Sequence, residues 1–80
     1  MRRRSKAAQA EERRRTRALA ALEERINELE AEIGMIEEAM CSEETLSDYV
    51  RLREYDEKLG ALKAELDEAY EKWLGEGGGA

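Results

Sequence analysis

The sequence predicts an all-α protein that folds as a two-helix antiparallel coiled-coil hairpin, and three observations support this. The 80 residues include no Pro, and 42% of them are charged, a composition typical of long helices and coiled coils. Apolar residues recur at alternating steps of three and four in two separate stretches, which is the coiled-coil pattern. A short polar segment joins the stretches, so the two helices are expected to fold back on each other.

The first element is the N-terminal segment of residues 1–17, which has the opposite charge to the rest of the chain. It carries eight basic and two acidic side chains, a sum of +6, whereas residues 18–80 carry six basic and eighteen acidic ones, a sum of −12. Ala7, Ala8 and Ala10 favour helix here. We therefore expect this basic segment to be a helical extension or linker ahead of the hairpin.

The hairpin is expected to span residues 18–74, with its first helix over residues 18–40. Isoleucine and leucine dominate the a and d positions of this helix, which are Leu19, Leu22, Ile26, Leu29, Ile33, Ile36 and Met40. The second helix is expected over residues 48–74. Its seam has the same steps and consists of Leu52, Tyr55, Leu59, Leu62, Leu66, Ala69 and Trp73. The sequence GEGGGA at 75–80 predicts a helix stop and a flexible tail.

The loop between the helices is expected at residues 41–47. Ser42 can cap a short helical turn, and either Ser47 or Asp48 can cap the second helix. The alternative is one continuous helix in a long parallel dimer. That arrangement is disfavoured because the twelve-residue gap from Met40 to Leu52 interrupts the heptad.

The seams also suggest a register for the hairpin. Pairing a positions with d positions gives the expected neighbours Ile33 and Tyr55, Leu29 and Leu59, and Ile26 and Leu62. This register would bring together three pairs of opposite charge, Glu30–Lys63, Glu32–Lys58 and Arg25–Glu65. It would also place Trp73 level with Arg15, where a guanidinium can stack on the indole.

Composition argues against catalysis and against a membrane span. The chain has no His and a single cysteine, Cys41, so it lacks the Cys–His catalytic pair, an internal disulfide and the common zinc spacings. It has no phosphate-binding loop, and we expect no cofactor and no metal. No apolar run approaches the roughly 20 residues that cross a bilayer. We expect a cytoplasmic binding or scaffolding module rather than an enzyme.

The basic segment is the candidate binding site. Clustered arginines with an aromatic nearby can contact phosphate backbones and exposed bases. Two alternatives are a solvated extension and contact with an anionic membrane. The candidate nucleic-acid-binding residues are Arg2, Arg3, Arg4, Lys6, Arg13, Arg14, Arg15, Arg17 and Trp73.

Local motifs resemble one known family. The basic lead-in is followed by the helix LAALEERINELEAEIGMIEEAM, the loop CSEETLSDYVRL and the helix LREYDEKLGALKAELDEAYEKWL. This order resembles the C-terminal coiled-coil domain of ABC-F ATPases of the Uup type, the duplicated ATP-binding-cassette proteins without transmembrane segments. Ser47, Asp48 and Tyr49 match that family's SDY, and residues 70–73 (YEKW) match its YERW pattern. Glu43 stands where the family has a loop proline.

The resemblance implies a domain that follows the second ATPase cassette of a cytoplasmic bacterial protein. Its implied partners are these cassettes and nucleic acid, either DNA or ribosomal RNA. The chain itself has no ATPase motif, so the ATPase activity would belong to the parent protein. The alternative function is a structural coiled coil for protein–protein interaction or dimerisation, and the hairpin itself could be a monomer or a homodimer.

Overall fold

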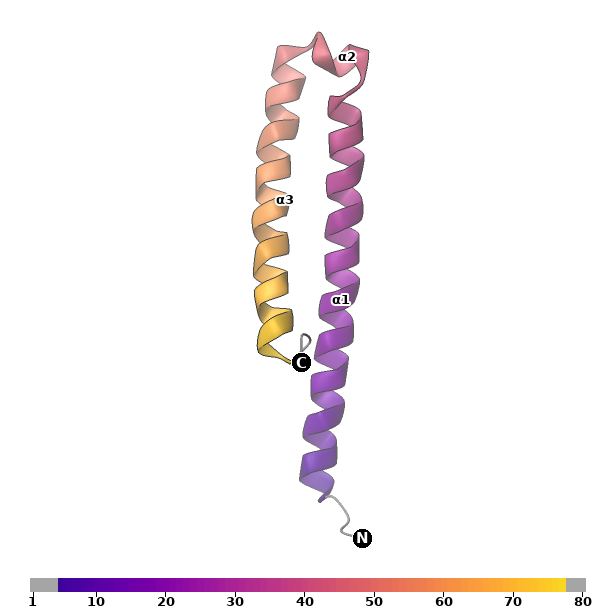
Figure 1. The fold of residues 1–80 in the computed structure, drawn as a ribbon, viewed down its shortest axis with the longest axis vertical. Helices are drawn as coiled ribbons and strands as arrows, with labels where there is room; N and C mark the ends of the chain where they lie inside the picture. Colours follow the sequence, from indigo (N-terminus) through magenta and orange to yellow (C-terminus); the bar gives the residue numbers. More distant parts are fainter. Residues whose placement is uncertain (1–4, 78–80) are drawn as a thin grey trace.

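The computed structural model describes residues 5–77, which form a long and narrow hairpin of three helices (Figure 1). They are α1 (Lys6–Met40), α2 (Glu43–Leu46) and α3 (Tyr49–Gly75). Helices α1 and α3 run antiparallel side by side, and α2 crosses between them at the tip (Figure 1). The molecule measures 68 × 17 × 15 Å. The fold class expected from the sequence, an all-α antiparallel hairpin, is confirmed.

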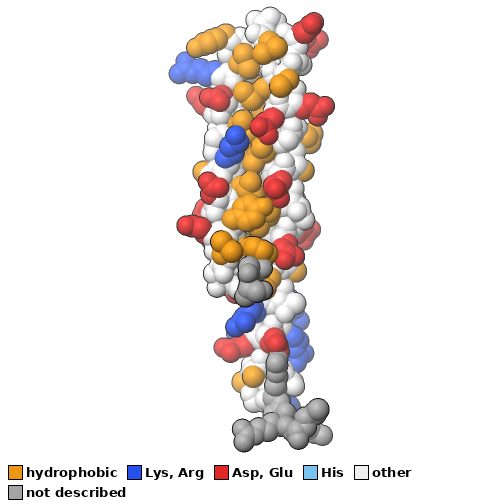
Figure 2. Space-filling view, viewed as in Figure 1, with side chains coloured by type: hydrophobic (Ala, Val, Ile, Leu, Met, Phe, Trp, Pro, Cys, Tyr) orange, Lys and Arg blue, Asp and Glu red, His pale blue; other side chains and the backbone are white. Residues whose placement is uncertain are grey.

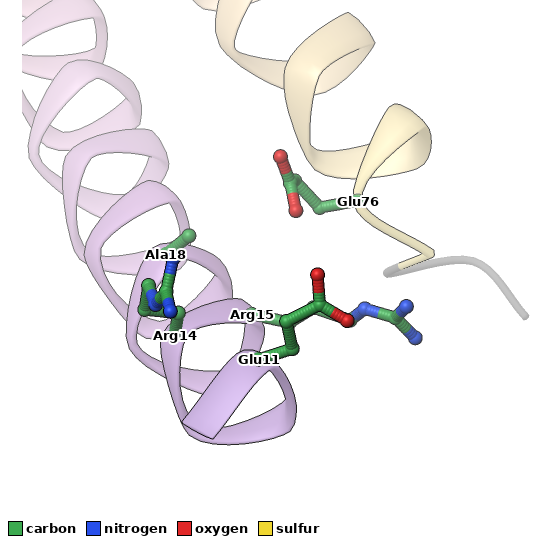
Figure 3. A pocket seen from close by; sticks show the side chains of 5 residues that line it. All are labelled: Glu11, Arg14, Arg15, Ala18 and Glu76. Carbon is green, nitrogen blue, oxygen red and sulfur yellow. The ribbon is translucent and has the colours of Figure 1, made fainter. Parts of the chain in front are cut away.

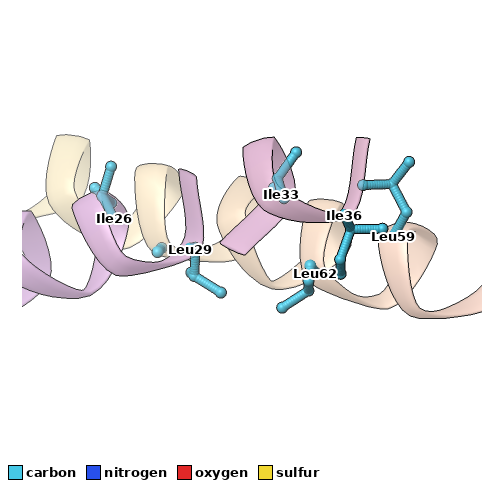
Figure 4. Close-up of a cluster of buried hydrophobic side chains, with 7 residues drawn as sticks. Ile26, Leu29, Ile33, Ile36, Leu59 and Leu62 are labelled. Carbon is cyan, nitrogen blue, oxygen red and sulfur yellow. The ribbon is translucent and has the colours of Figure 1, made fainter. Parts of the chain in front are cut away.

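The core of the hairpin is the seam that the heptads predict. Its buried side chains are Ile26, Leu29, Ile33 and Ile36 from α1 and Leu59, Leu62 and Ala69 from α3 (Figure 4). Leu29 has no exposed surface. The other seam positions are half-buried, because two helices alone cannot enclose a seam on all sides. None of the described helices is long and apolar enough to cross a membrane.

The register differs from the one expected, by about half a heptad. Met40 and Leu52 line one hollow at the tip, and Leu22 and Ala69 line another near the open end. Each seam residue of α1 therefore meets the residue of α3 that lies one seam step further toward the open end than expected, which means that α3 is shifted toward the tip. The cause of this register lies at the tip. The two seams first meet at Met40 and Leu52, and α2 forms part of the connection between these two residues.

The tip is held by two side-chain caps. The backbone N–H of Thr45 donates to the Ser42 hydroxyl at 3.3 Å and begins α2. The backbone N–H of Arg51 donates to the Asp48 carboxylate at 3.1 Å and begins α3. The sequence allowed Ser47 or Asp48 as the cap of the second helix, and the structure selects Asp48. Thr45 is the one buried polar residue of the described chain.

One of the three expected ion pairs forms. The Arg25 guanidinium lies 2.8 Å from the Glu65 carboxylate on α3 and 3.1 Å from Glu28 on its own helix. Hydrogen bonds to Glu65 and Glu28 raise the pKa of Arg25 further above its ordinary value. The expected pairs Glu30–Lys63 and Glu32–Lys58 are not among the ion pairs of residues 5–77.

Candidate nucleic-acid interface

The basic arm, residues 5–17, is the part of α1 that projects past the end of α3 (Figure 1). Ser5 caps α1, since its hydroxyl accepts a hydrogen bond from the Ala8 backbone N–H at 3.2 Å. Helix α3 stops at Gly75. Its C-cap residue Glu76 shares a hollow with Arg14 and Arg15 of the arm (Figure 3). The arm N-terminal to this point has no helix packed against it among the described residues.

The cations of the arm divide over two faces of the helix. Counting the heptad of α1 backwards from Leu19 places four of them on b, c and f positions, away from the seam. We call these four residues the cationic face: Lys6, Arg13, Arg14 and Arg17. Three of them line one shallow hollow together with Ala10. No acidic residue lies on this face, so its positive field is weakened only at the edge, where Arg14 shares a hollow with Glu11 and Glu76.

The seam side of the arm has mixed charge. Glu11, Glu12 and Arg15 continue the line of the core seam beyond α3 and surround a second hollow with Ala8. Figure 3 shows Glu11 and Arg15 extending side by side below the end of α3, with Glu76 on the opposite side. Because acidic side chains accompany Arg15 here, this side of the arm attracts anions less strongly than the cationic face.

The side chains of the cationic face are open to solvent. Residues 11–17 are all exposed, and the Nε of Arg13 donates at 3.4 Å to the backbone carbonyl of Gln9 one turn earlier. Figure 2 shows blue side chains, together with some red ones, on the arm below the end of α3, whereas most charged side chains on the hairpin above it are red. The arm therefore offers a compact cationic surface whose charges are free to meet an anion.

Trp73 lies apart from this surface. Its indole Nε1 donates to the Glu23 carboxylate at 3.2 Å, and its ring packs against the core. Tyr70 meets the indole edge-on, with ring centroids 6.5 Å apart. The expected stacking on Arg15 is wrong, because the shifted register carries Trp73 toward the tip and onto Glu23.

The sequence reasoning missed the division of the arm into two faces, although the signal was present. Continuing the three-and-four steps backwards from Leu19 reaches Arg15, Glu12 and Ala8, which assigns Arg15 to the seam side. The expected contacts Arg2, Arg3 and Arg4 lie outside the described residues.

The side chains of the arm are suited to binding anions. Within residues 5–77 no group of three or more His, Cys, Asp or Glu side chains comes together as a metal site. Cys41, at the C-cap of α1, is exposed and free. The chemistry that the arm offers is therefore charge and hydrogen-bond donation from guanidinium groups, which suit phosphate oxygens.

Comparison with known proteins identifies the family. Comparison with curated proteins and with solved structures finds no match. A family model described as the ABC transporter C-terminal domain matches residues 10–75. The match includes both long helices of the hairpin and the tip, and it confirms the resemblance drawn from the loop and the YEKW ending. The chain belongs to the ABC transporter C-terminal domain family, the coiled-coil domain found in ABC-F proteins of the Uup type.

Proposed function

We propose that this domain is a non-catalytic module of an ABC-F-type ATPase and that it contacts nucleic acid, either DNA or ribosomal RNA, through the cationic face of its basic arm. One observation carries the proposal. Four exposed cations share a helix face that carries no acidic residue. Helix α3 leaves that face uncovered except at its edge, where Arg14 shares a hollow with Glu11 and Glu76.

The physical argument rests on phosphate neutralisation. A cation that pairs with a phosphate releases a condensed counterion, which favours binding at low salt. Lys6 and Arg17 lie eleven residues apart, which is roughly 16 Å along a helix, so the face can meet several phosphates at once. Contacts of this kind position a protein on a nucleic acid without reading its sequence.

The proposal assigns different roles to the residues expected from the sequence. Lys6, Arg13, Arg14 and Arg17 contact phosphates. Arg15 belongs to the mixed seam side, and Trp73 supports the open end of the hairpin. In a cytoplasmic parent protein the ATPase cassettes would bind and hydrolyse ATP, while this domain would add affinity for the nucleic acid.

Fluorescence anisotropy with a labelled DNA duplex and a labelled structured RNA tests the proposal. The test variant changes Arg13, Arg14 and Arg17 to Gln. A matched control changes Arg51, Lys58 and Lys72 on α3 to Gln, which alters the net charge by the same amount. We expect binding by the wild-type chain and the control, and a loss of at least tenfold in affinity for the test variant.

Each other outcome is informative. If both variants lose affinity equally, net charge rather than the cationic face drives binding, and the site assignment is wrong. If neither nucleic acid binds the wild-type chain at low salt, nucleic acid is rejected as a partner of this domain. A preference between the two probes selects DNA or ribosomal RNA.

A further inference from the structure

A second heptad pattern runs along the exposed surface of α3, beside the core seam. It occupies the e and b positions of the heptad. Successive residues of this pattern are alternately four and three residues apart in the sequence, so they are neighbours on the helix surface. We call it the e/b stripe. Its e column is Tyr49, Asp56, Lys63 and Tyr70, and its b column is Arg53, Gly60, Asp67 and Leu74.

Every member of the e/b stripe is exposed in the structure. Three of its residues are large and apolar or aromatic: Tyr49 is 78% exposed, Leu74 59% and Tyr70 39%. The stripe joins these residues to two charges of each sign. An exposed helix face with this mixture can dock a protein surface.

The e/b stripe is complementary to a second copy of itself that runs in the opposite direction. The e column reads aromatic, acid, base, aromatic. Consider a second copy that runs antiparallel, with the Gly60 residues of the two copies opposite each other. Asp56 of one copy then lies at the level of Lys63 of the other, to within about one residue. The same operation brings Tyr49 level with Tyr70, and Arg53 level with Asp67. Opposite charges therefore meet at each charged position of the stripe.

We propose that the e/b stripe is a dimerisation interface and that its partner is a second copy of this chain, packed antiparallel about a two-fold axis at Gly60. An isologous contact of this kind uses one self-complementary surface twice. The proposal does not depend on the basic arm or on nucleic-acid binding.

The single chain leaves the charges of the stripe available for such a contact. Asp56, Lys63 and Asp67 take part in none of the ion pairs of the described chain. Arg53 has one loose pair, 4.0 Å from Glu57, and its side chain is 74% exposed. In a dimer, each of these four charged side chains would pair with an opposite charge of the second copy. This pairing would also set the antiparallel direction, because complementary charges select one register.

Gly60 would allow the α3 helices of the two copies to approach each other closely at the two-fold axis. A Cβ at this position would meet nothing within 4 Å in the single chain, so the hairpin itself does not require glycine there. Glycine in a helix interior costs about 1 kcal/mol relative to alanine. A close crossing of two backbones at Gly60 gives this residue a role that the isolated hairpin lacks.

The equivalent positions on α1 cannot pair in this way. Its e column contains Glu23, Glu30 and Glu37, which would place like charges opposite one another in any antiparallel pairing. Gly34 is the counterpart of Gly60 on a b position of α1 and has equally open surroundings. The two helices therefore provide an internal control: each has an exposed glycine, but only α3 has a self-complementary stripe around it.

Sedimentation velocity over a wide range of protein concentrations tests the interface. The test variant is Gly60→Lys, and the matched control is Gly34→Lys. Both substitutions place a better helix former in open space, so circular dichroism should show that both variants fold. We expect dimers for the wild-type chain and for Gly34→Lys, and monomers for Gly60→Lys. A monomeric wild-type chain, or a Gly60→Lys variant that still dimerises, would overturn the proposal.

A charge exchange tests the pairing directly. Asp56→Lys and Lys63→Asp should each weaken the dimer at least tenfold, because each places like charges opposite each other. The double variant restores opposite charges and should recover the wild-type dissociation constant. If the double variant is as weak as the single ones, Asp56 and Lys63 do not face each other and the register is wrong.

The antiparallel direction can be measured through Cys41, which is exposed. Tyr49 lies eleven residues from Gly60, or roughly 16 Å along the helix, so the two tips of the dimer should lie at least about 30 Å apart. Nitroxide labels on Cys41 should report a distance of this size between the copies. A much shorter distance would indicate pairing through the tips and would contradict the proposed axis.

Discussion

The indole N–H of Trp73 donates to the carboxylate of Glu23 across the open end of the hairpin, at 3.2 Å. Glu23 lies eight residues further along α1 than Arg15, a distance of about 12 Å along the helix. The contact therefore fixes both the register of the two helices and the position of the aromatic side chain. Because of this contact, Trp73 packs at the open end of the hairpin and not against the cationic face of the arm.

Replacing Trp73 with Phe should leave nucleic-acid affinity unchanged. The substitution keeps an aromatic ring against the core, but it removes the hydrogen bond to Glu23 and part of the packing surface of the indole. We expect the free energy of unfolding to fall by about 1 kcal/mol, measured by urea denaturation. A loss of affinity in the anisotropy assay would show that the indole contacts bases, and the proposed role of Trp73 would then be wrong.

Leu29→Ala should come close to unfolding the domain. Leu29 has no exposed surface, and removing a buried leucine side chain costs about 2–5 kcal/mol. A narrow hairpin of 80 residues has little stability to spare. Met35, which is 70% exposed, provides the control, since Met35→Ala should change stability by less than about 0.5 kcal/mol. Thermal melts followed by circular dichroism would compare the two variants.

Gly34, which lies outside the proposed dimer interface, should be replaceable at a gain in stability. A Cβ at Gly34 or Gly60 meets no atom within 4 Å, and alanine is favoured over glycine in a helix interior by about 1 kcal/mol. Gly34→Ala should therefore raise the free energy of unfolding by about that amount, measured by urea denaturation at low protein concentration. A decrease would mean that Gly34 contacts something that the isolated hairpin lacks.

The cap of α3 should contribute measurably to closing the hairpin. Asp48→Ala removes the acceptor for the backbone N–H of Arg51 and should cost about 1 kcal/mol. Asp48→Asn keeps a side-chain oxygen in the same place and should be almost neutral. Equal losses in both variants would show that the charge of Asp48, rather than its capping hydrogen bond, stabilises the tip.

Much of the fold followed from the sequence because coiled-coil periodicity encodes it directly. Each seam residue proposed from the three-and-four steps is buried or half-buried. Ser42 caps the turn at the tip. The register was less certain, because a seam with a regular repeat can slide by half a heptad and still pair apolar residues. Only the closure at Met40 and Leu52 selects one solution.

The candidate site was located from the sequence but not resolved into its faces. The charge asymmetry marks residues 1–17 without showing which arginines share a surface. The structure shows that α1 continues through the arm from Lys6, so the helical repeat of 3.6 residues places the arginines on different faces of the helix. It also shows that the end of α3 falls beside Arg14 and Arg15 of the arm, which depends on the register of the two helices. These two facts separate Arg15 from Arg13 and Arg17.

The most direct test of the central claim is the salt dependence of binding to a DNA duplex. On duplex DNA, each phosphate contact contributes about 0.9 to the slope of log K against log salt. Changing Arg13, Arg14 and Arg17 to Gln should therefore reduce the slope by about 2.7, while Arg15→Gln should change it by much less. An unchanged slope in the triple variant would contradict the assignment of phosphate contacts to the cationic face.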